Sequence, residues 1–116
     1  MIRSNKDCSV KKNEKPFDGA LYVEVTELVS SPEELYGKGR CFAHSKLPVG
    51  GEIGFHKHNR ECEIYHILCG SGMFNDNGVM SKVGRGDVTI TKSGEGHGLK
   101  NIGSEPLEFI ALILFQ

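Results

Sequence analysis

The chain has 116 residues, 15 of them glycine, and carries 14 Lys and Arg against 15 Asp and Glu, a formal net charge of −1. This length suits one domain with one hydrophobic core. The near-neutral charge argues against nucleic-acid binding, which needs a clear basic excess to neutralise phosphates. Glycine is nearly twice its usual share of about 7% and proline is scarce, so we expect many tight turns and many short strands.

No segment has the features of a membrane span or a secretion signal. The longest apolar run, residues 109–115, is far shorter than the roughly 18 residues that a membrane span requires. The first residues of the chain contain no apolar stretch. The four cysteines match no paired zinc-ligand spacing. We therefore expect reduced thiols in a cytoplasmic protein that binds neither membrane nor nucleic acid.

The N-terminal segment, residues 1–19, is mildly basic and poor in apolar residues. We expect it to be an arm that is either mobile or packed over the rest of the molecule. Residues 20–116 are expected to form a single domain.

Two elements are predicted between this arm and residue 40. Alternation places Leu21, Val23 and Val25 on one face of a strand. The run Ser31-Pro32-Glu33-Glu34 is a capping box with proline at the first helical position, which predicts a short helix that ends near Tyr36.

From residue 40 onward, short strand-like runs alternate with turn residues. The expected strands are residues 40–47, 52–58, 63–69, 73–75, 79–83, 87–91, 97–102 and 107–115. Asn77-Gly78 is a strong hairpin signal between two of them. Regularly spaced short strands predict an all-β sandwich or barrel.

The last of these strands, residues 107–115, is almost continuously apolar, which is typical of a strand buried on both faces. In a one-domain barrel its outer face must be covered by the N-terminal segment or by a second subunit. We therefore expect a homodimer.

Two of the five histidines, His56 and His58, are separated by one residue in a predicted strand. At this spacing the two imidazoles share a face, about 6.6 Å apart along the chain, and can converge on one ion. The alternative is a pair of solvated histidines on a strand edge. Glu63 favours the metal site, because a carboxylate at the start of an apolar strand is costly to bury unless it is paired or ligates a metal. Flanking glycines let the backbone bend His97 toward the same site.

This donor set constrains the ion. Three imidazoles and one carboxylate suit Mn, Fe, Ni, Cu or Zn and are poor ligands for Mg or Ca.

Two spaced patterns in this region resemble the conserved motifs of the cupin superfamily. They are Gly50-x5-His56-x-His58-x4-Glu63-x6-Gly70 and Gly86-x7-Gly94-x2-His97-x3-Asn101. Nine of the ten fixed positions match, and the exception is Lys92, which stands where the second motif normally has proline.

The resemblance implies a fold and a ligand set. The fold is a double-stranded β-helix, or jelly roll, here with a short helix near the N-terminus. The implied ligands of one divalent transition metal are His56, His58, Glu63 and His97, with open coordination positions for a small molecule.

Three further residues are candidates for the pocket. Glu61 is an alternative ligand, an acceptor for an imidazole N–H, or an exposed turn carboxylate. Tyr65 shares the face of Glu63 by alternation and either contacts substrate or fills the core, whereas His66 falls on the opposite face. His44 is a pocket residue if the even-numbered residues of its strand face inward, and a surface residue otherwise.

Three functions are compatible with the resemblance. The first is a metal-dependent enzyme of the oxygenase, decarboxylase or isomerase type that acts on a small polar or carboxylate substrate. The second is a non-catalytic module that binds a small molecule or a metal. The third is a metal-free cupin similar to sugar epimerases, against which the complete four-ligand set argues. The fold alone does not choose among them.

Overall fold

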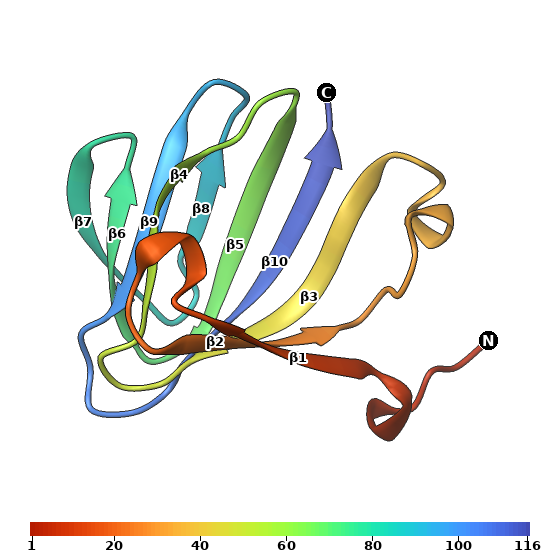
Figure 1. Cartoon of the computed structure of the whole chain (residues 1–116), viewed down its shortest axis with the longest axis horizontal. Coiled ribbons are helices and arrows are strands. Elements are labelled where there is room, and N and C mark those ends of the chain that lie inside the picture. Colours follow the sequence, from red (N-terminus) through yellow and green to blue (C-terminus); the bar gives the residue numbers. More distant parts are fainter.

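A computed structural model describes all 116 residues and contains two antiparallel β-sheets that enclose one core (Figure 1). The six-stranded sheet has the order β1-β2-β3-β10-β5-β8, and the four-stranded sheet has the order β4-β9-β6-β7. The strands are β1 (Ser9–Glu14), β2 (Tyr22–Glu27), β3 (Gly39–Leu47), β4 (Glu52–Lys57), β5 (Glu61–Cys69), β6 (Ser71–Asp76), β7 (Val79–Gly84), β8 (Val88–Thr91), β9 (Gly96–Asn101) and β10 (Leu107–Phe115). This is the predicted all-β jelly roll.

All eight strands expected from residue 40 onward are present, with ends that lie within two residues of the predicted ones. The turn residues account for this agreement, since they mark where each strand must stop. The earlier strand begins at Tyr22 rather than at Leu21, because Leu21 has a left-handed backbone (φ 58°) that cannot continue a strand.

The predicted short helix is wrong. Its residues form a single 3₁₀ turn, η3 (Pro32–Leu35), which ends at Tyr36 in a left-handed conformation. Ser31 makes no side-chain cap, and the Glu34 carboxylate instead accepts hydrogen bonds from the backbone N–H and the hydroxyl of Ser30. The other two short turns are η1 (Asn5–Asp7) and η2 (Pro16–Asp18), and no helix has the length and apolar composition needed to cross a membrane.

Strand β10 lies in the middle of the six-stranded sheet, between β3 and β5. Its odd-numbered residues up to Ile113 are buried in the core, but the even-numbered residues on its outer face are only partly buried. Within one chain, therefore, the outer face of this strand is not fully buried. The N-terminal segment does not cover this face, because β1 and β2 extend the sheet sideways beyond β3.

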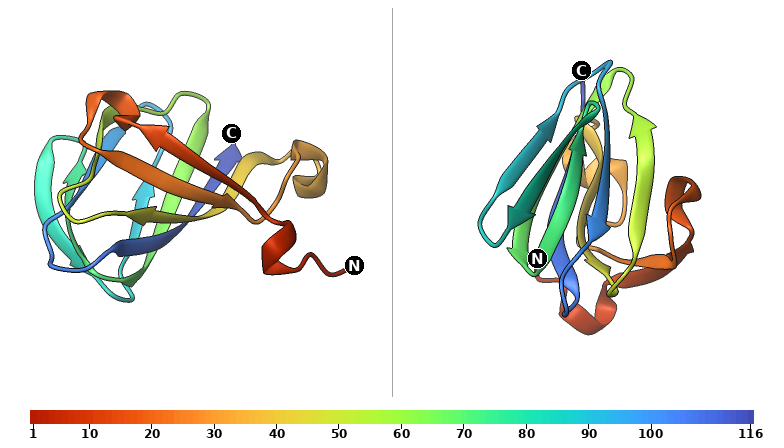
Figure 2. Two further views of the ribbon diagram at one scale, coloured as in Figure 1. Left: turned by 60° about the horizontal axis from the view of Figure 1, so that its bottom comes forward. Right: turned by 90° about the vertical axis from the view of Figure 1, so that its left-hand side faces the viewer.

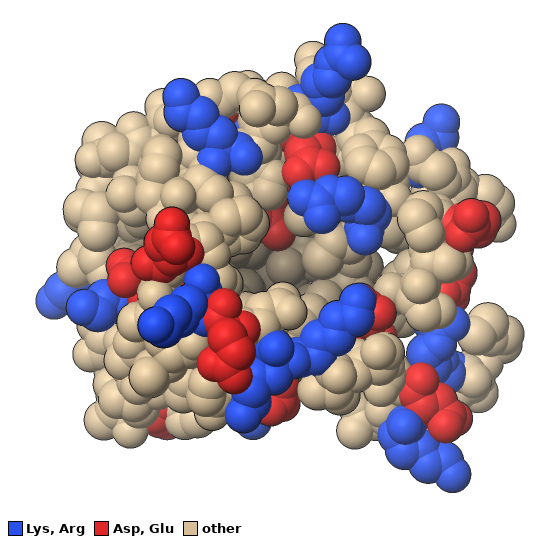
Figure 3. Space-filling model, viewed as in Figure 1, with Lys and Arg blue, Asp and Glu red and all other residues tan.

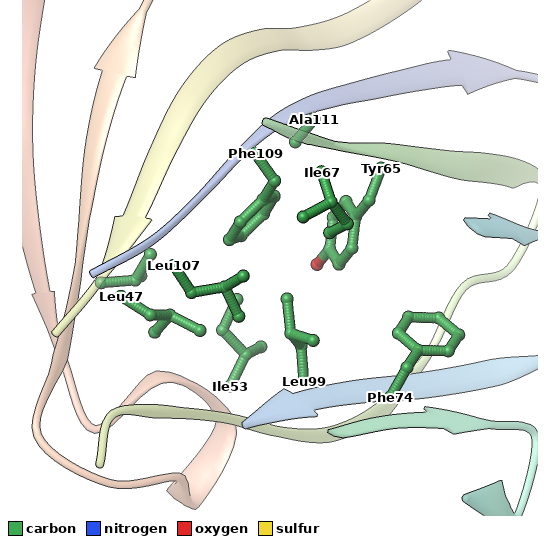
Figure 4. Close-up of a cluster of buried hydrophobic side chains, with 10 residues drawn as sticks. Leu47, Ile53, Tyr65, Ile67, Phe74, Leu99, Leu107, Phe109 and Ala111 are labelled. Atoms are coloured by element: carbon green, nitrogen blue, oxygen red, sulfur yellow. The ribbon is translucent and has the colours of Figure 1, made fainter. Parts of the chain in front are cut away.

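Large apolar side chains fill one end of the space between the sheets (Figure 4). Leu47, Ile67 and Leu107 are completely buried there, and Phe109 is 1% exposed. Tyr65 and Phe74 lie toward the other end, where their rings contact His97.

The N-terminal segment is joined to the barrel by close backbone contacts. Strand β1 pairs with β2 along its whole length, and the loop that carries η2 curls back against β4 (Figures 1 and 2). Ala20 and Glu52 exchange two backbone hydrogen bonds of 3.0 and 2.9 Å. A Cβ at Gly54 would overlap the carbonyl oxygen of Phe17, so the loop lies this near to β4 because the strand has glycine at that point.

We expect Gly54→Ala to lower the free energy of unfolding by about 2 kcal/mol, since the added methyl group must displace backbone rather than a mobile side chain. Gly84→Ala in β7 is the matched control, because the nearest atom to its added Cβ is 3.8 Å away. Urea unfolding should show a change of less than about 0.5 kcal/mol for the control. Equal stability of the two variants would contradict the close docking of the loop.

Candidate metal site

Pairing between β4 and β9 places His56 directly opposite His97. A register shift between Ile53 and His56 interrupts the alternation of β4. As a result Ile53 and His56 both face the interior, whereas Phe55 points outward and is 47% exposed. His58 follows the end of β4 and is held by a hydrogen bond from its backbone N–H to the carbonyl of Glu95.

Four side chains converge between the two sheets. The Nε2 atom of His97 is 3.2 Å from Nε2 of both His56 and His58. Oε1 of Glu63, from β5, is 2.9 Å from Nε2 of His97 and 3.1 Å from Nε2 of His58. All four ligand atoms lie within 4.8 Å of one another. The structure therefore brings together the four residues that the two motifs single out.

The second ring nitrogen of each histidine, Nδ1, has a hydrogen-bond partner in the protein. Nδ1 of His56 lies 2.8 Å from the carbonyl oxygen of Gly54, and Nδ1 of His58 lies 2.9 Å from the Glu61 carboxylate. Since these oxygens can only accept, each Nδ1 carries a proton and donates it. Nδ1 of His97 is 2.7 Å from the Thr91 hydroxyl. The Nε2 lone pairs are thereby directed toward a common point, as in histidines that ligate metals.

This arrangement fits a transition-metal ion. Two ligand atoms bound at right angles to one ion, each about 2.1 Å from it, are about 3.0 Å apart, which matches the separations between neighbouring ligand atoms here. His58, Glu63 and His97 are at most 6% exposed, and a cation between them would offset the repulsion of lone pairs that face one another at such distances. The mixed nitrogen and oxygen donors suit Mn, Fe, Ni, Cu or Zn.

Protonation of these groups follows from their contacts. Burial lowers the pKa of His56, which favours the neutral imidazole needed for metal binding. Burial opposes ionisation of Glu63, but hydrogen bonds with His58 and His97 outweigh it and lower the pKa of that carboxyl to about 2. The hydrogen bond with Glu63 raises the pKa of His58.

Glu61 does not belong to the four-ligand group but supports it from outside. Its carboxylate accepts from Nδ1 of His58 and takes two hydrogen bonds of 2.7 and 2.8 Å from the Arg40 guanidinium. The hydrogen bond from Arg40 lowers the pKa of Glu61 to about 2. Of the alternatives for Glu61, the structure shows the acceptor of an imidazole N–H.

A cavity of about 350 Å³ adjoins the cluster and is lined by three of its members, His56, His58 and Glu63. The space-filling view shows a hollow near the middle of this face, with charged side chains of both signs around it (Figure 3). The arm supplies part of the wall through Lys11, Asn13, Pro16 and Phe17. The ring of Phe17 stacks on His56, with centroids 3.7 Å apart and planes within 9°.

The other candidates are divided between the two faces of the six-stranded sheet. Tyr65 lines the cavity, stacks on His97 with ring centroids 5.0 Å apart, and is buried, which raises the pKa of its phenol well above the ordinary value. His44 lies on the outer face, where its Nε2 is 3.1 Å from the Glu108 carboxylate. The odd-numbered residues of its strand face inward, so the second alternative for His44 holds. His66 is exposed on the outer face.

Lys92, which replaces the usual proline, donates its backbone N–H to the Glu95 carboxylate at 2.9 Å. Its carbonyl oxygen accepts from the backbone N–H of Glu95. A proline could not make the first of these bonds. The turn before His97 is thus closed by a hydrogen bond that the substitution makes possible.

Sequence reasoning missed several residues of the site, among them Phe17, Arg40 and Thr91. Phe17 and Arg40 reach it from segments 39 and 18 residues away from His56 and His58, and no local pattern marks such contacts. Thr91 had a signal in the sequence, because it is the last residue of a predicted strand, just before the turn that leads to His97. In the structure it pairs with Glu63, and its hydroxyl lies beside Nδ1 of His97.

In the metal-free protein, we expect the pairing of Glu63 with its histidines to be most stabilising between about pH 4.5 and 6.5. The contribution of Glu63 is present above its ordinary pKa of 4.5 and is lost as the pH falls toward 2. The contribution of His58 is present below its ordinary pKa of 6.5 and is lost as the pH rises through the raised value. The loss at low pH should amount to a few kcal/mol, at about 1.4 kcal/mol per pKa unit.

Urea unfolding at a series of pH values in the presence of a chelator measures this dependence. Glu63→Gln should flatten the profile, and Glu33→Gln, which changes an exposed carboxyl, should leave it as in the wild type. An unchanged profile in Glu63→Gln would show that the pair does not control the stability.

Comparisons with known proteins agree with this architecture. The family model of the cupin domain matches residues 43–113. A protein from Thermotoga maritima named oxalate-binding protein is 48% identical over 92 residues, which are 79% of this chain and 75% of that protein. A predicted oxalate decarboxylase from the same organism has a crystal structure with a TM-score of 0.94 and 40% identity, over the whole of both chains.

A more distant structure shares the fold alone. The cupin domain of Cnp3 from Schizosaccharomyces pombe has a TM-score of 0.73 at 17% identity, over 93% of this chain and 70% of that one. The match of the family model, together with the 48% identical relative, shows that this chain belongs to the cupin family.

Proposed function

We propose that this protein binds one divalent transition metal through His56, His58, Glu63 and His97 and uses it to bind a small carboxylate of the oxalate type. The observation that carries the proposal is the convergence of three Nε2 atoms and one carboxylate oxygen beside a cavity. The identity of the metal among Mn, Fe, Ni, Cu and Zn, and the cytoplasmic location, stay predictions from the sequence.

The charges around the cavity favour an anionic ligand once the ion is bound. Lys11 is paired with Glu27 at 2.7 Å, and Arg40 is paired with Glu61. Glu63 neutralises only one of the two charges of a divalent cation. The positive charge that remains faces the cavity, where low polarity strengthens its attraction for a carboxylate.

The relatives support this class of ligand. The curated relative and the solved structure from Thermotoga maritima both carry names that refer to oxalate, and the structure matches this chain over its whole length. Oxalate binds metals through two oxygens at once, which suits an ion that has four protein ligands and open coordination positions toward the cavity. A bound metal of this kind supplies Lewis-acid or redox activation of its ligand.

Catalysis is the second candidate, and Tyr65 is the residue that favours it. Its buried phenol lies on the cavity wall beside His97, and the raised pKa keeps the hydroxyl protonated. A neutral hydroxyl beside the ion can donate a hydrogen bond to negative charge that develops on a metal-bound ligand, as in decarboxylation or isomerisation. An enzyme of the decarboxylase or isomerase type is therefore the natural extension of the binding function.

We also propose that the protein is a homodimer that pairs through the outer face of the six-stranded sheet. Strand pairing places apolar side chains side by side on this face, which we call the outer patch; it consists of Phe42, Ile64, Val88, Ile90, Ile110 and Leu112. Val88 and Ile90 are each 56% exposed in the single chain. A contiguous apolar face of this kind is typical of a subunit interface.

For the metal site, we expect protein purified without a histidine tag to bind one ion per chain and to bind oxalate only when the ion is present. His56→Ala should lower the metal affinity by more than the 10- to 100-fold that loss of an outer hydrogen-bonding partner costs. Elemental analysis, followed by calorimetric titration with oxalate, measures both quantities.

His66→Ala is the matched control, since this histidine is exposed on the outer face of β5. It should retain the metal and the oxalate binding of the wild type. Metal content that is equal in His56→Ala and in the wild type would refute the site. Oxalate binding by the metal-free protein would refute the role of the ion.

For the dimer, light scattering should give the mass of two chains, and Ile90→Lys should give the mass of one. A lysine at this position would place a charge in the apolar interface without a partner. Val79→Lys, at a residue that is 66% exposed on the other sheet, should remain dimeric. A monomeric wild type would exclude the proposal.

A further inference from the structure

Small side chains on the two central strands of the six-stranded sheet, among them Ser45 of β3 and Ala111 of β10, line part of the cavity floor. Ala111 of β10 pairs with Tyr65 on one side and with Ala43 of β3 on the other, and Ala43 pairs in turn with Glu27 of β2. Ser45, the next inward-facing residue of β3, is also small and buried. Farther along the same face, Leu47 and Leu107 fill the core, so the space is open where the residues are small.

This space exceeds what oxalate needs. Its volume of about 350 Å³ corresponds to about a dozen waters at roughly 30 Å³ each. Oxalate has six heavy atoms, fewer than the waters that the cavity could hold, and would leave much of it unfilled. Half of the lining residues are hydrophobic, and among them Val25, Ala111 and Ile113 provide no hydrogen-bonding side chain for the waters that would remain.

The cavity also lacks an uncompensated cation away from the ligand cluster. Lys11 and Arg40, its two basic residues, are each held by a carboxylate at 2.7 Å. A second carboxylate at the far end of a longer ligand would therefore meet neutral ion pairs and apolar wall. This favours a ligand that is charged only at the end next to the metal.

From these observations we infer that the preferred ligand is a monocarboxylic acid with an apolar substituent, whose chain lies over Ala111 between Val25 and Ile113. The inference rests on the metal-dependent carboxylate binding proposed above and specifies the ligand class of that site. The acid group and a neighbouring oxygen occupy the metal side, and the chain displaces water from the small-residue floor. Burial of each methylene then adds to the affinity.

A series of 2-oxo acids tests this, because they share the chelating end and differ only in the chain. Protein loaded with Co²⁺ is titrated with glyoxylate, pyruvate, 2-oxobutyrate and 2-oxovalerate, with oxalate as the reference. Calorimetry gives the dissociation constants, and the visible spectrum of Co²⁺ shows that each acid reaches the metal. We expect affinity to rise about threefold to fourfold per added carbon, at about 0.8 kcal/mol per buried methylene.

Substitutions of Ala111 on the cavity floor test whether the dependence of affinity on chain length arises there. The ratio of the dissociation constants of glyoxylate and 2-oxovalerate should be about 30 to 60 in the wild type, from three such steps. Ala111→Leu should bring it close to one, because the added side chain occupies the space of the ligand chain. Ala111→Val adds less volume and should give an intermediate ratio, which keeps the test decisive if the leucine variant does not fold. Val79→Phe enlarges an exposed residue on β7 and should retain the full ratio.

Two results would overturn the inference while leaving the metal-dependent binding of carboxylates intact. One is oxalate as the tightest ligand, with affinity that is flat or falls along the series. The other is a folded Ala111→Leu or Ala111→Val variant that keeps the wild-type ratio. If Co²⁺-loaded protein binds neither oxalate nor any 2-oxo acid, the proposed function fails and this inference fails with it.

Discussion

The irregular pairing of β4 with β9 is the constraint on which the rest of the site depends. A regular strand would align Ile53 with Phe55 and Lys57 and would turn His56 and His58 outward. The register shift before His56 reverses the alternation, so that His56 faces His97 and its Nδ1 meets the carbonyl oxygen of Gly54. The Nε2 lone pairs of the two histidines then meet beside Glu63, 3.2 Å apart.

Around this cluster the basic side chains are paired with carboxylates, so the net charge of an ion bound there would have no other partner in the protein. Arg40 is neutralised by Glu61, which in turn orients His58, and Lys11 is neutralised by Glu27. The cavity between these pairs is walled by apolar and small residues. Such a site has little attraction for anions until a cation is present. Under the proposed function, recognition of an anionic ligand therefore depends on the bound ion through electrostatics.

Local patterns predicted the framework well and failed where contacts between distant segments took over. The strands from β3 to β10 follow from turn residues, and Glu63 and Tyr65 share a face because alternation in β5 is regular. The η3 turn was mistaken for a helix because Tyr36 adopts a left-handed backbone that no capping pattern reveals. Strand β1 has no apolar alternation, since all its residues are exposed, and it exists through its pairing with β2.

The sequence by itself determined the fold class and the positions of the strands, because the spacing of turn residues is a local property, and its resemblance to the two cupin motifs singled out His56, His58, Glu63 and His97. Only the tertiary structure decided that Phe17 stacks on His56, that Arg40 supports Glu61, and that His44 lies outside. It also decided the cavity, whose volume arises from small residues that pair across β3 and β10. Such features depend on which strands become neighbours, and that pairing is set by the packing of the whole chain.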